Sequence, residues 1–428
     1  MTTSSGDRVF SVGSSNIVFG PGARHELGDH AAALGLRRVL LFTDAVLAPG
    51  ETVSDAVASL RDVGIEVDTY DAVSVEPTDR SFQDATSVAT AGDYDGFVAV
   101  GGGSSMDTAK AANLYATHPD DFLAYVNPPI GRGAAPPGPL RPLICLPTTA
   151  GTGSETTGVA VFDLLERRAK TGIAHRLLRP TLGIVDPEAT LTLPPMVAAA
   201  SGFDVLSHAL ESYTALRSDE RPVADPPANR PAYQGANPFS DIWAEQALVM
   251  VARSMPRVLA DPADIEARTE MSLAATFAGI GFGTAGVHLP HGMSYAVSGM
   301  VRDYRPGGYP SGQAIVPHGM SVVLNAPAVM RFTASADPER HLRAAGLLGA
   351  DVRGAGPDDA ADMLAGRLVD LMQLARIPNG LAGVGYGEGD IDALVEGTLP
   401  QHRVTKLSPR PVGRDELALL FRNSLQAW

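Results

Sequence analysis

Strand and helix signals alternate through residues 1–190 of this chain. A short apolar run at 38–42 and strand-like segments at 65–70 and 95–100 are separated by helical patterns around 51–63 and 79–91. This order favours a doubly wound parallel sheet, because parallel strands need a crossover that is usually a helix. Such sheets bind ligands at the carboxyl ends of their strands. We therefore expect an α/β N-terminal domain whose ligand site lies at that edge of the sheet.

The second half of the chain has a different pattern. From about residue 191 it is rich in Ala, Leu and Met at helical spacing, with polar, proline-rich interruptions at 217–238 and 302–317. A length of 428 residues suits two domains of about 150–200 residues each. The sequence thus predicts an α/β domain at 1–190 and an all-α C-terminal domain at 191–428.

One carboxylate and three imidazoles stand out in the predicted helical domain. Asp204 and His208 are four residues apart, so a helix places them on one face. The pentapeptide Pro-His-Gly-Met-Ser occurs twice and supplies His291 and His318. One Asp with three His suits Fe(II), Zn(II) or Mn(II) and excludes a thiolate-rich zinc site. Any one of these histidines could be an ordinary hydrogen-bonded residue, but the set of four predicts a metal site.

A glycine-rich segment follows the strand-like run at 95–100 and opens a helix. It contains Gly101, Gly102, Gly103, Ser104, Ser105 and Asp107. Glycines let the backbone approach a pyrophosphate, and the helix N-terminus offers free N–H groups to it. The pattern is not G-x-G-x-x-G, so a tight turn is the alternative, and Asp107 could simply pair with Lys110 one turn later.

Other polar residues lie near strand ends in the same domain. Asp44 ends an early strand, where a carboxylate can bind ribose hydroxyls and repel a 2′-phosphate, which favours NAD over NADP; a turn-capping Asp is the alternative. Thr148, Thr149 and Thr152 bring hydroxyls to a flexible loop that suits phosphate and ribose contacts, although a plain turn would explain part of it. Lys170 is one of three lysines in a chain that otherwise uses arginine, which suggests a position that needs a compact ammonium.

Composition restricts the partners. The net charge of −15 argues against nucleic acid and anionic membranes, so we expect small-molecule partners. The single cysteine, Cys145, fits a reducing compartment. No apolar run approaches ~18 residues, and the N-terminus shows no signal-peptide or transit-peptide pattern. These features predict a cytoplasmic protein.

Four motifs in this order resemble a known family. They are GGGSSMDTAK at 101–110, LPTTAGTGSETTGVAVFD at 146–163, GFDVLSHALESYT at 202–214 and the two PHGMS repeats. The chain resembles the iron-containing (group III) alcohol dehydrogenases over nearly its whole length. Within that family it is most similar to the hydroxyacid-oxoacid transhydrogenases, on the further stretches 75–78, 113–116, 230–235, 277–283 and 403–407.

The resemblance implies an α/β N-terminal dinucleotide-binding domain, an all-α C-terminal metal-binding domain, and roles for the residues above. Asp204, His208, His291 and His318 would hold a divalent metal, Fe(II) first and Zn(II) second. Asp44, Gly101 to Ser105, Asp107, Thr148, Thr149, Thr152 and Lys170 would form the NAD site. Many relatives read H-G-M-A-H where this chain reads His291-Gly-Met-Ser-Tyr295, so a second histidine is absent. Tyr295 or His288 could take over its proton relay, or both could be structural.

The implied reaction is hydride transfer through NAD from 4-hydroxybutyrate to 2-oxoglutarate. An alcohol or 4-hydroxybutyrate dehydrogenase with exchangeable NAD would use the same residues, and a non-catalytic metal- or nucleotide-binding protein is a remote alternative. Because the net charge repels acids, local cations are needed, and the candidates are Arg331, Arg340, Arg403 and Lys406. We also expect a homodimer or larger homo-oligomer.

Overall fold

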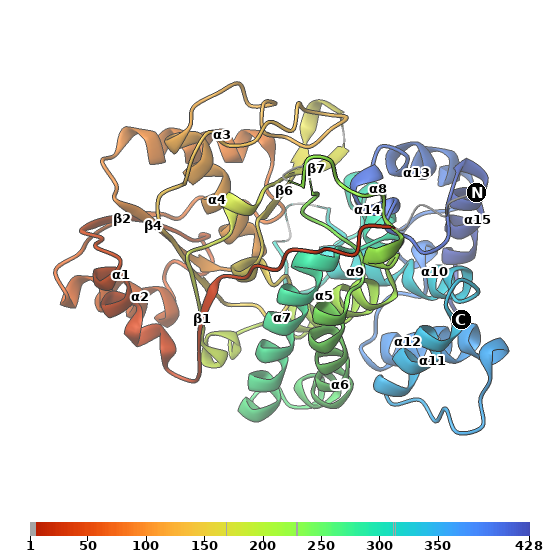
Figure 1. Ribbon diagram of the computed structural model, residues 1–428. Helices are drawn as coiled ribbons and strands as arrows, with labels where there is room; N and C mark the ends of the chain where they lie inside the picture. Colours follow the sequence, from red (N-terminus) through yellow and green to blue (C-terminus); the bar gives the residue numbers. More distant parts are fainter. Residues whose placement is uncertain (1–5, 168, 228–229, 311, 313) are drawn as a thin grey trace. The chain divides into compact units, whose positions relative to one another are not determined.

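The structure is a computed structural model that describes residues 6–428 except 168, 228–229, 311 and 313 (Figure 1). The chain divides into two compact units. The first, Ser14–Leu193, is called the sheet unit below. The second, Pro194–Trp428 with the N-terminal segment that ends at Gly13, is called the helical unit. Each unit is described by itself.

A six-stranded sheet forms the centre of the sheet unit. Every neighbouring pair of its strands is parallel, and their order is β1-β8-β5-β4-β2-β3. The strands are β1 (Asn16–Phe19), β2 (Arg38–Phe42), β3 (Glu66–Tyr70), β4 (Gly96–Gly101), β5 (Leu143–Pro147) and β8 (Leu182–Val185). The predicted parallel α/β sheet is confirmed.

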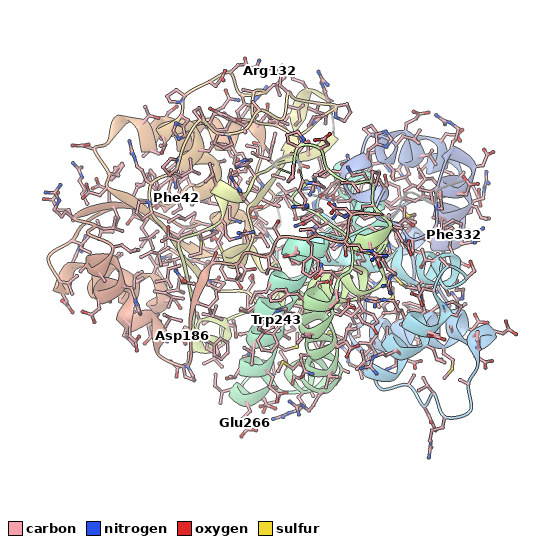
Figure 2. All side chains as sticks on the ribbon, viewed as in Figure 1. Phe42, Arg132, Asp186, Trp243, Glu266 and Phe332 are labelled. Atoms are coloured by element: carbon pink, nitrogen blue, oxygen red, sulfur yellow. The ribbon has the colours of Figure 1, made fainter. Side chains whose placement is uncertain are left out.

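Helices cover both faces of this sheet. Val39 and Leu41 pack in one cluster with α1 (Leu27–Ala33) and α2 (Glu51–Asp62). The alternate residues Leu40 and Phe42 pack in another cluster with α3 (Asp79–Ala91) and α4 (Gly103–Thr117). Phe42 also contacts the rings of Tyr70 and Phe97 (Figure 2). Burial on both faces explains why the inner strands β2, β4, β5 and β8 are largely apolar, whereas the edge strand β3 is more polar and exposed.

The sheet unit also contains an antiparallel hairpin that the sequence analysis did not predict. It pairs β6 (Val159–Leu164) with β7 (Ala169–Ala174). Phe162 of this hairpin packs against Phe82 of α3, with ring centroids 5.2 Å apart. The short 3-10 helices of this unit are η1 (Ala23–Glu26), η2 (Ser154–Thr156), η3 (Leu165–Arg167), η4 (Arg176–Leu178) and η5 (Pro187–Thr190).

The helical unit matches the prediction of a helical second half. In the part that the structure describes, its only strand-like feature is an isolated bridge between Arg217 and Ala236. Its helices are α5 (Pro195–Thr214), α6 (Pro238–Ala260), α7 (Ile265–Ala285), α8 (Leu289–Gly299), α9 (His318–Val323), α10 (Ala326–Thr333), α11 (Pro338–Leu347), α12 (Ala360–Leu374), α13 (Ile391–Thr398), α14 (His402–Thr405) and α15 (Arg414–Ser424). Its 3-10 helices are η6 (Ser218–Glu220), η8 (Pro357–Asp359), η9 (Leu381–Val384) and η10 (Glu388–Asp390).

Helices α5, α6 and α7 pack against one another and form the support of this unit. A Cβ at Gly202 of α5 would lie 2.9 Å from Met255 Sδ of α6, so the glycine permits the close approach of the two helices. Trp243 of α6 packs edge-on against Phe277 of α7, with centroids 4.8 Å apart (Figure 2). Within the described residues no single helix is long and apolar enough to cross a membrane. The pair α7 and α8 passes that test together, but it is bent by 104°.

Candidate functional site

The four predicted metal ligands come together inside the helical unit. Asp204 and His208 lie on α5, while His291 lies near the start of α8 and His318 begins α9. Asp204 Oδ1 lies 3.8 Å from His208 Nε2, 3.7 Å from His291 Nε2 and 3.7 Å from His318 Nε2. One ligand atom from each residue lies within 4.8 Å of the other three. Segments more than a hundred residues apart therefore build one cluster of donors.

The donor atoms fit a shared metal ion better than they fit one another. Asp204 Oδ1 and His291 Nε2 are buried and have no hydrogen-bond partner among the described residues. Separations of 3.7 to 3.8 Å are too long for hydrogen bonds. They are short enough for a common ion, since two ligands each about 2.1 Å from it stand at most about 4.2 Å apart. Oxygen and imidazole nitrogen suit a divalent transition metal.

The two copies of the repeated pentapeptide make the same local hydrogen bond beside their histidines. Ser294 donates a 2.7 Å hydrogen bond to the carbonyl of His291, and Ser321 donates one of equal length to the carbonyl of His318. The glycine of the second repeat also permits a close approach, because a Cβ at Gly319 would collide with the carbonyl oxygen of Ala200 on α5. The repeat thus lets α9 lie directly on α5 beside Asp204.

Glu211 is a functional residue of the site that the sequence analysis missed. Its Oε1 accepts a 2.6 Å hydrogen bond from His291 Nδ1, and its Oε2 accepts from the backbone N–H groups of His288 and His291 at 2.8 and 3.3 Å. This leaves His291 Nε2 to face Asp204. Carboxylates behind metal-bound imidazoles fix the ring and its tautomer in this way. The signal was available, because 204, 208 and 211 share one helical face.

Electrostatics give the ligands different protonation preferences. Burial lowers the pKa of His208 to about 3, so its ring is neutral and offers a lone pair. Burial also disfavours the charged form of His291, but Glu211 and Asp204 outweigh it and raise the pKa of His291 to about 9. Burial alone would raise the pKa of Asp204, yet the surrounding imidazoles hold it below its usual value. Asp204 is therefore an anion, as a metal ligand must be.

Aromatic rings surround the nitrogen donors. The ring of Phe282 stacks on His208, with centroids 4.0 Å apart and planes 8° apart. His208 in turn stacks on His291 at 4.6 Å. Tyr233 meets Phe282 edge-on at 6.5 Å. These contacts hold the imidazoles in fixed orientations, which favours a preorganised site.

The two proton-relay candidates differ in their surroundings. Tyr295 is buried one turn after His291 on α8, and its hydroxyl accepts a 3.2 Å hydrogen bond from Arg403 Nη2. His288 is fully buried, and its Nε2 lies 3.0 Å from the hydroxyl of Thr214. This contact joins the end of α5 to the start of α8, which is a structural role for His288.

The predicted nucleotide loops of the sheet unit lie against each other. Gly101 ends β4, and Gly102 is the N-cap of α4. A Cβ at Gly102 would lie 3.2 Å from Thr149, and a Cβ at Gly103 would lie 2.6 Å from Thr152. The N–H of Thr148 donates to the carbonyl of Gly101 at 3.0 Å. The structure therefore brings the glycine-rich segment and the threonine loop together at the carboxyl ends of β4 and β5.

Two other predicted cofactor residues, Asp44 and Asp107, are hydrogen-bonded to protein groups. Asp44 Oδ1 accepts from the N–H groups of residues 46 and 47 at 2.9 and 3.0 Å, as a turn cap does. Asp107 accepts from the Ser154 hydroxyl at 2.7 Å and from the N–H of Val161 at 2.9 Å. The buried Lys110, its expected partner, donates to the Ser154 hydroxyl at 2.5 Å. Asp107 thus ties α4 to the threonine loop and the hairpin.

Lys170 on β7 lies between two carboxylates. Its Nζ is 2.6 Å from Glu76 Oε2 and 3.1 Å from Asp163 Oδ1. Burial alone would lower the pKa of Lys170, but these carboxylates raise it above its ordinary value. The N–H of Glu76, which has a positive φ of 54°, donates to the Ser104 hydroxyl at 3.2 Å. Ser104 and Lys170 are therefore joined through Glu76.

Two family models match the two halves of the chain. "Iron-containing alcohol dehydrogenase" matches residues 14–187, and "Fe-containing alcohol dehydrogenase family, C-terminal" matches residues 232–425. Among curated proteins, the mitochondrial hydroxyacid-oxoacid transhydrogenase of Xenopus laevis is 53% identical over 99% of this chain and 92% of its own length. The Homo sapiens protein of that name is 52% identical over 99% of this chain and 91% of its own length.

Solved structures agree with these matches. A 1,3-propanediol oxidoreductase superposes with a TM-score of 0.85 at 29% identity, covering 97% of this chain and 100% of that one. A sulfoacetaldehyde reductase from Bifidobacterium kashiwanohense superposes with a TM-score of 0.80 at 25% identity, covering 98% and 99%.

The expectation of a cytoplasmic location is contradicted by these relatives. The similar proteins from Xenopus laevis, Mus musculus and Homo sapiens are all named mitochondrial. Net charge and cysteine count could not decide the location, because transport depends on an address segment that receptors read and not on the folded domains.

The two family models and the similarity along the chain agree with the ligand cluster of Asp204, His208, His291 and His318. The chain therefore belongs to the iron-containing alcohol dehydrogenase family and is, within it, an oxidoreductase similar to the hydroxyacid-oxoacid transhydrogenases.

Proposed function

We propose that this chain transfers a hydride from 4-hydroxybutyrate to 2-oxoglutarate through an NAD that stays bound. The observation that supports this most is the identity of more than half of its residues with hydroxyacid-oxoacid transhydrogenases along almost the full chain. The metal ligands all belong to that matched length.

The two half-reactions balance without another oxidant or reductant. Carbon 4 of 4-hydroxybutyrate gives a hydride to NAD and its hydroxyl loses a proton, which yields succinate semialdehyde. The NADH then gives the hydride to carbon 2 of 2-oxoglutarate, whose oxygen takes up a proton, which yields 2-hydroxyglutarate. No free NADH is released.

We propose that the quartet holds Fe(II), with Zn(II) as the alternative. A divalent ion there would supply Lewis-acid polarisation of the substrate oxygen. The chain's own residues prepare the site: Asp204 supplies a negative charge, the neutral His208 supplies a lone pair, and Glu211 orients His291. Tyr295, one turn from His291 and hydrogen-bonded to Arg403, is the proposed proton relay.

We further propose that NAD binds to the sheet unit. Asp44 would bind a ribose hydroxyl through its second carboxylate oxygen. Gly101 to Ser105 at the start of α4 would bind the pyrophosphate together with Thr148, Thr149 and Thr152. Asp107 and Lys170 would hold these loops in position, Asp107 through its hydrogen bond with Ser154 and Lys170 through its ion pair with Glu76. The similar sulfoacetaldehyde reductase, whose structure holds NAD+, supports the choice of cofactor.

The test is turnover without added cofactor. The metal-loaded, desalted protein is given 4-hydroxybutyrate and 2-oxoglutarate, and both products are measured by mass spectrometry. The heat-denatured protein is assayed for released NAD. We expect both products in equal amounts and about one NAD per chain. Loading the metal-free protein anaerobically with Fe(II) or Zn(II) in parallel identifies the active metal.

The alternative is an ordinary dehydrogenase with exchangeable NAD. The likeness to 1,3-propanediol oxidoreductase favours it, since that protein is named for action on an alcohol. Activity that depends on supplied NAD, together with no cofactor in the denatured protein, would select this alternative. We also propose that the chain forms a homodimer or a larger homo-oligomer. Light scattering coupled to size-exclusion chromatography measures the mass of this assembly.

A further inference from the structure

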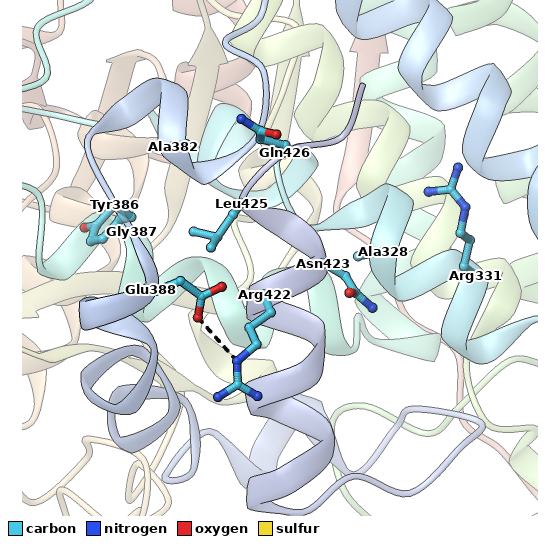
Figure 3. A pocket seen from close by; sticks show the side chains of 10 residues that line it. All are labelled: Ala328, Arg331, Ala382, Tyr386, Gly387, Glu388, Arg422, Asn423, Leu425 and Gln426. Atoms are coloured by element: carbon cyan, nitrogen blue, oxygen red, sulfur yellow. Dashed lines mark hydrogen bonds and ion pairs between the residues drawn. The ribbon is translucent and has the colours of Figure 1, made fainter.

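Four cations were candidates for binding the carboxylate of an acidic substrate, and the structure separates them. Arg331 pairs with Asp362 at 3.1 Å and lines a pocket of about 600 Å³ whose lining residues include none of the metal ligands (Figure 3). Arg340 binds Asp241 at 2.6 Å and also the carbonyl of Tyr213. Lys406 is exposed at the end of α14. The remaining candidate is Arg403.

Arg403 has donors that the protein does not use. Its Nη2 donates to the Tyr295 hydroxyl at 3.2 Å, and its Cζ lies 4.9 Å above the ring of Tyr233. Its Nη1 is buried and has no hydrogen-bond partner among the described residues. Within the same residues, the groups that interact with its charge are the tyrosines Tyr233 and Tyr295 and no carboxylate, although the side chain is only partly exposed. A partly buried cation without a counter-charge is an open position for an anion.

Two series of contacts connect Arg403 to the metal ligands. The first runs through Tyr295, which lies one helical turn after His291 on α8. The second runs through Tyr233 and Phe282, whose ring stacks on His208. Arg403 is therefore connected to His208 through two aromatic rings and to the helix of His291 through Tyr295.

Helix α14, which carries Arg403, packs against α8, which carries His291 (Figure 1). A Cβ at Gly292, the residue after His291, would lie 2.7 Å from Thr405 Cγ2, so this glycine permits the close approach. Tyr233, Phe282 and Arg403 also lie in the stretches 230–235, 277–283 and 403–407, by which this chain resembles the transhydrogenases rather than alcohol dehydrogenases in general.

We propose that Arg403 binds the carboxylate of the hydroxy acid and oxo acid substrates, with Tyr295 and Tyr233 holding its guanidinium in place. This inference rests on the proposed function. A guanidinium offers two parallel N–H donors to a carboxylate, and the net charge of −15 makes such a local cation necessary. Arg403 would thus select acids over neutral alcohols of the same length.

The kinetic test compares an acid with a neutral analogue. Arg403→Gln and Arg403→Lys are assayed in metal-loaded protein with supplied NAD, on 4-hydroxybutyrate and on butan-1-ol. We expect Arg403→Gln to raise the KM for the acid about 10- to 100-fold and to leave the KM for butan-1-ol nearly unchanged. Arg403→Lys, which keeps the charge but loses the paired donors, should lie between. Lys406→Gln, which removes an exposed cation three residues away, is the matched control and should alter neither KM.

A binding measurement separates this inference from the proposed reaction. Isothermal titration calorimetry measures the Kd of butyrate, which has the carboxylate but no hydroxyl, for the metal- and NAD-loaded protein. If Arg403→Gln binds butyrate more weakly than the wild type does, Arg403 binds the carboxylate. This conclusion holds even if the protein does not turn over 4-hydroxybutyrate, a result that would contradict only the proposed reaction. Equal butyrate binding, or KM values that rise together for the acid and the alcohol, would overturn the role of Arg403. Circular dichroism and metal content must match the wild type.

Discussion

Glu211 fixes which nitrogen of His291 faces the other ligands. The carboxylate is fully buried and accepts from one ring nitrogen and two backbone N–H groups. Burial would raise the pKa of Glu211, but His291 and the hydrogen bonds hold that pKa below its ordinary value. Glu211 is therefore a charged acceptor behind the ligand, and its effect is on the position and basicity of His291.

We predict that Glu211→Gln weakens metal binding about 10- to 100-fold. The amide keeps the shape of the side chain and one acceptor oxygen, but it cannot hold the imidazole with the strength of a carboxylate. The measurement is the metal content per chain after equilibration against buffered metal concentrations.

The control for this substitution is Glu266→Gln on α7, whose carboxylate is 84% exposed and pairs with Arg257 at the surface. It should leave metal affinity unchanged. A Glu211→Gln protein that binds metal as tightly as the wild type would show that Glu211 serves only to cap α8.

Between elements, the first turn of α4 and the loop at 148–152 depend on a close approach of their backbones. Gly103 marks this approach, because its Cβ position lies 2.6 Å from Thr152 Cγ2. We predict that Gly103→Ala forces the loop outward and weakens NAD binding about tenfold or more, while unfolding becomes easier by about 1–2 kcal/mol. Calorimetric titration with NAD and denaturant unfolding measure the two effects.

Gly366→Ala is the matched control for that substitution. Gly366 lies in α12, and a Cβ there would meet nothing within 4 Å. Alanine at an open helical position should preserve NAD binding and keep or raise the free energy of unfolding. If Gly103→Ala binds NAD normally, the loop at 148–152 moves aside freely, and the close approach has no part in nucleotide binding.

The elements that were predicted correctly have local signals, whereas the missed ones depend on distant partners. The strands β2 and β4 are apolar runs, and the more polar β3 contains the β-formers Val67, Thr69 and Tyr70 between two helical patterns, so a short window of sequence predicts all three. The hairpin of β6 and β7 includes Lys170 and pairs segments whose own pattern is weak. The strand order also could not be read from the sequence, since it results from packing on both faces of the sheet.

The site shows the same division. The four metal ligands were predicted, because their residue types and the repeated pentapeptide are visible in the sequence alone. The pairing of Asp107 with Lys110 one turn later was expected and is present at 3.6 Å, but the sequence did not reveal the contact of Asp107 with Ser154 or that of Lys170 with Glu76. Arg403 could not be separated from Arg331 and Arg340 until the ion pairs of the latter two were known.

At the scale of the whole molecule, the metal site joins segments that are far apart in the chain. Its ligands come from α5, α8 and α9, so a bound ion would link three helices that unfolding separates. An ion that binds only the folded state stabilises it by about 2.7 kcal/mol when its free concentration is about 100 times its Kd. Loss of that energy lowers the unfolding temperature of a unit of this size by about 5–10 °C.

We therefore predict that removing the metal with a chelator lowers the thermal midpoint by this amount and that adding Fe(II) or Zn(II) restores it, as followed by scanning calorimetry. His318→Ala removes one donor and should abolish the metal-dependent shift. His25→Ala, which removes a 57% exposed histidine of the sheet unit, should preserve it. A shared ion must stabilise the fold that assembles its ligands. If the thermal midpoint of the wild type does not respond to metal, or if His318→Ala responds fully, the four side chains do not act together as one metal site.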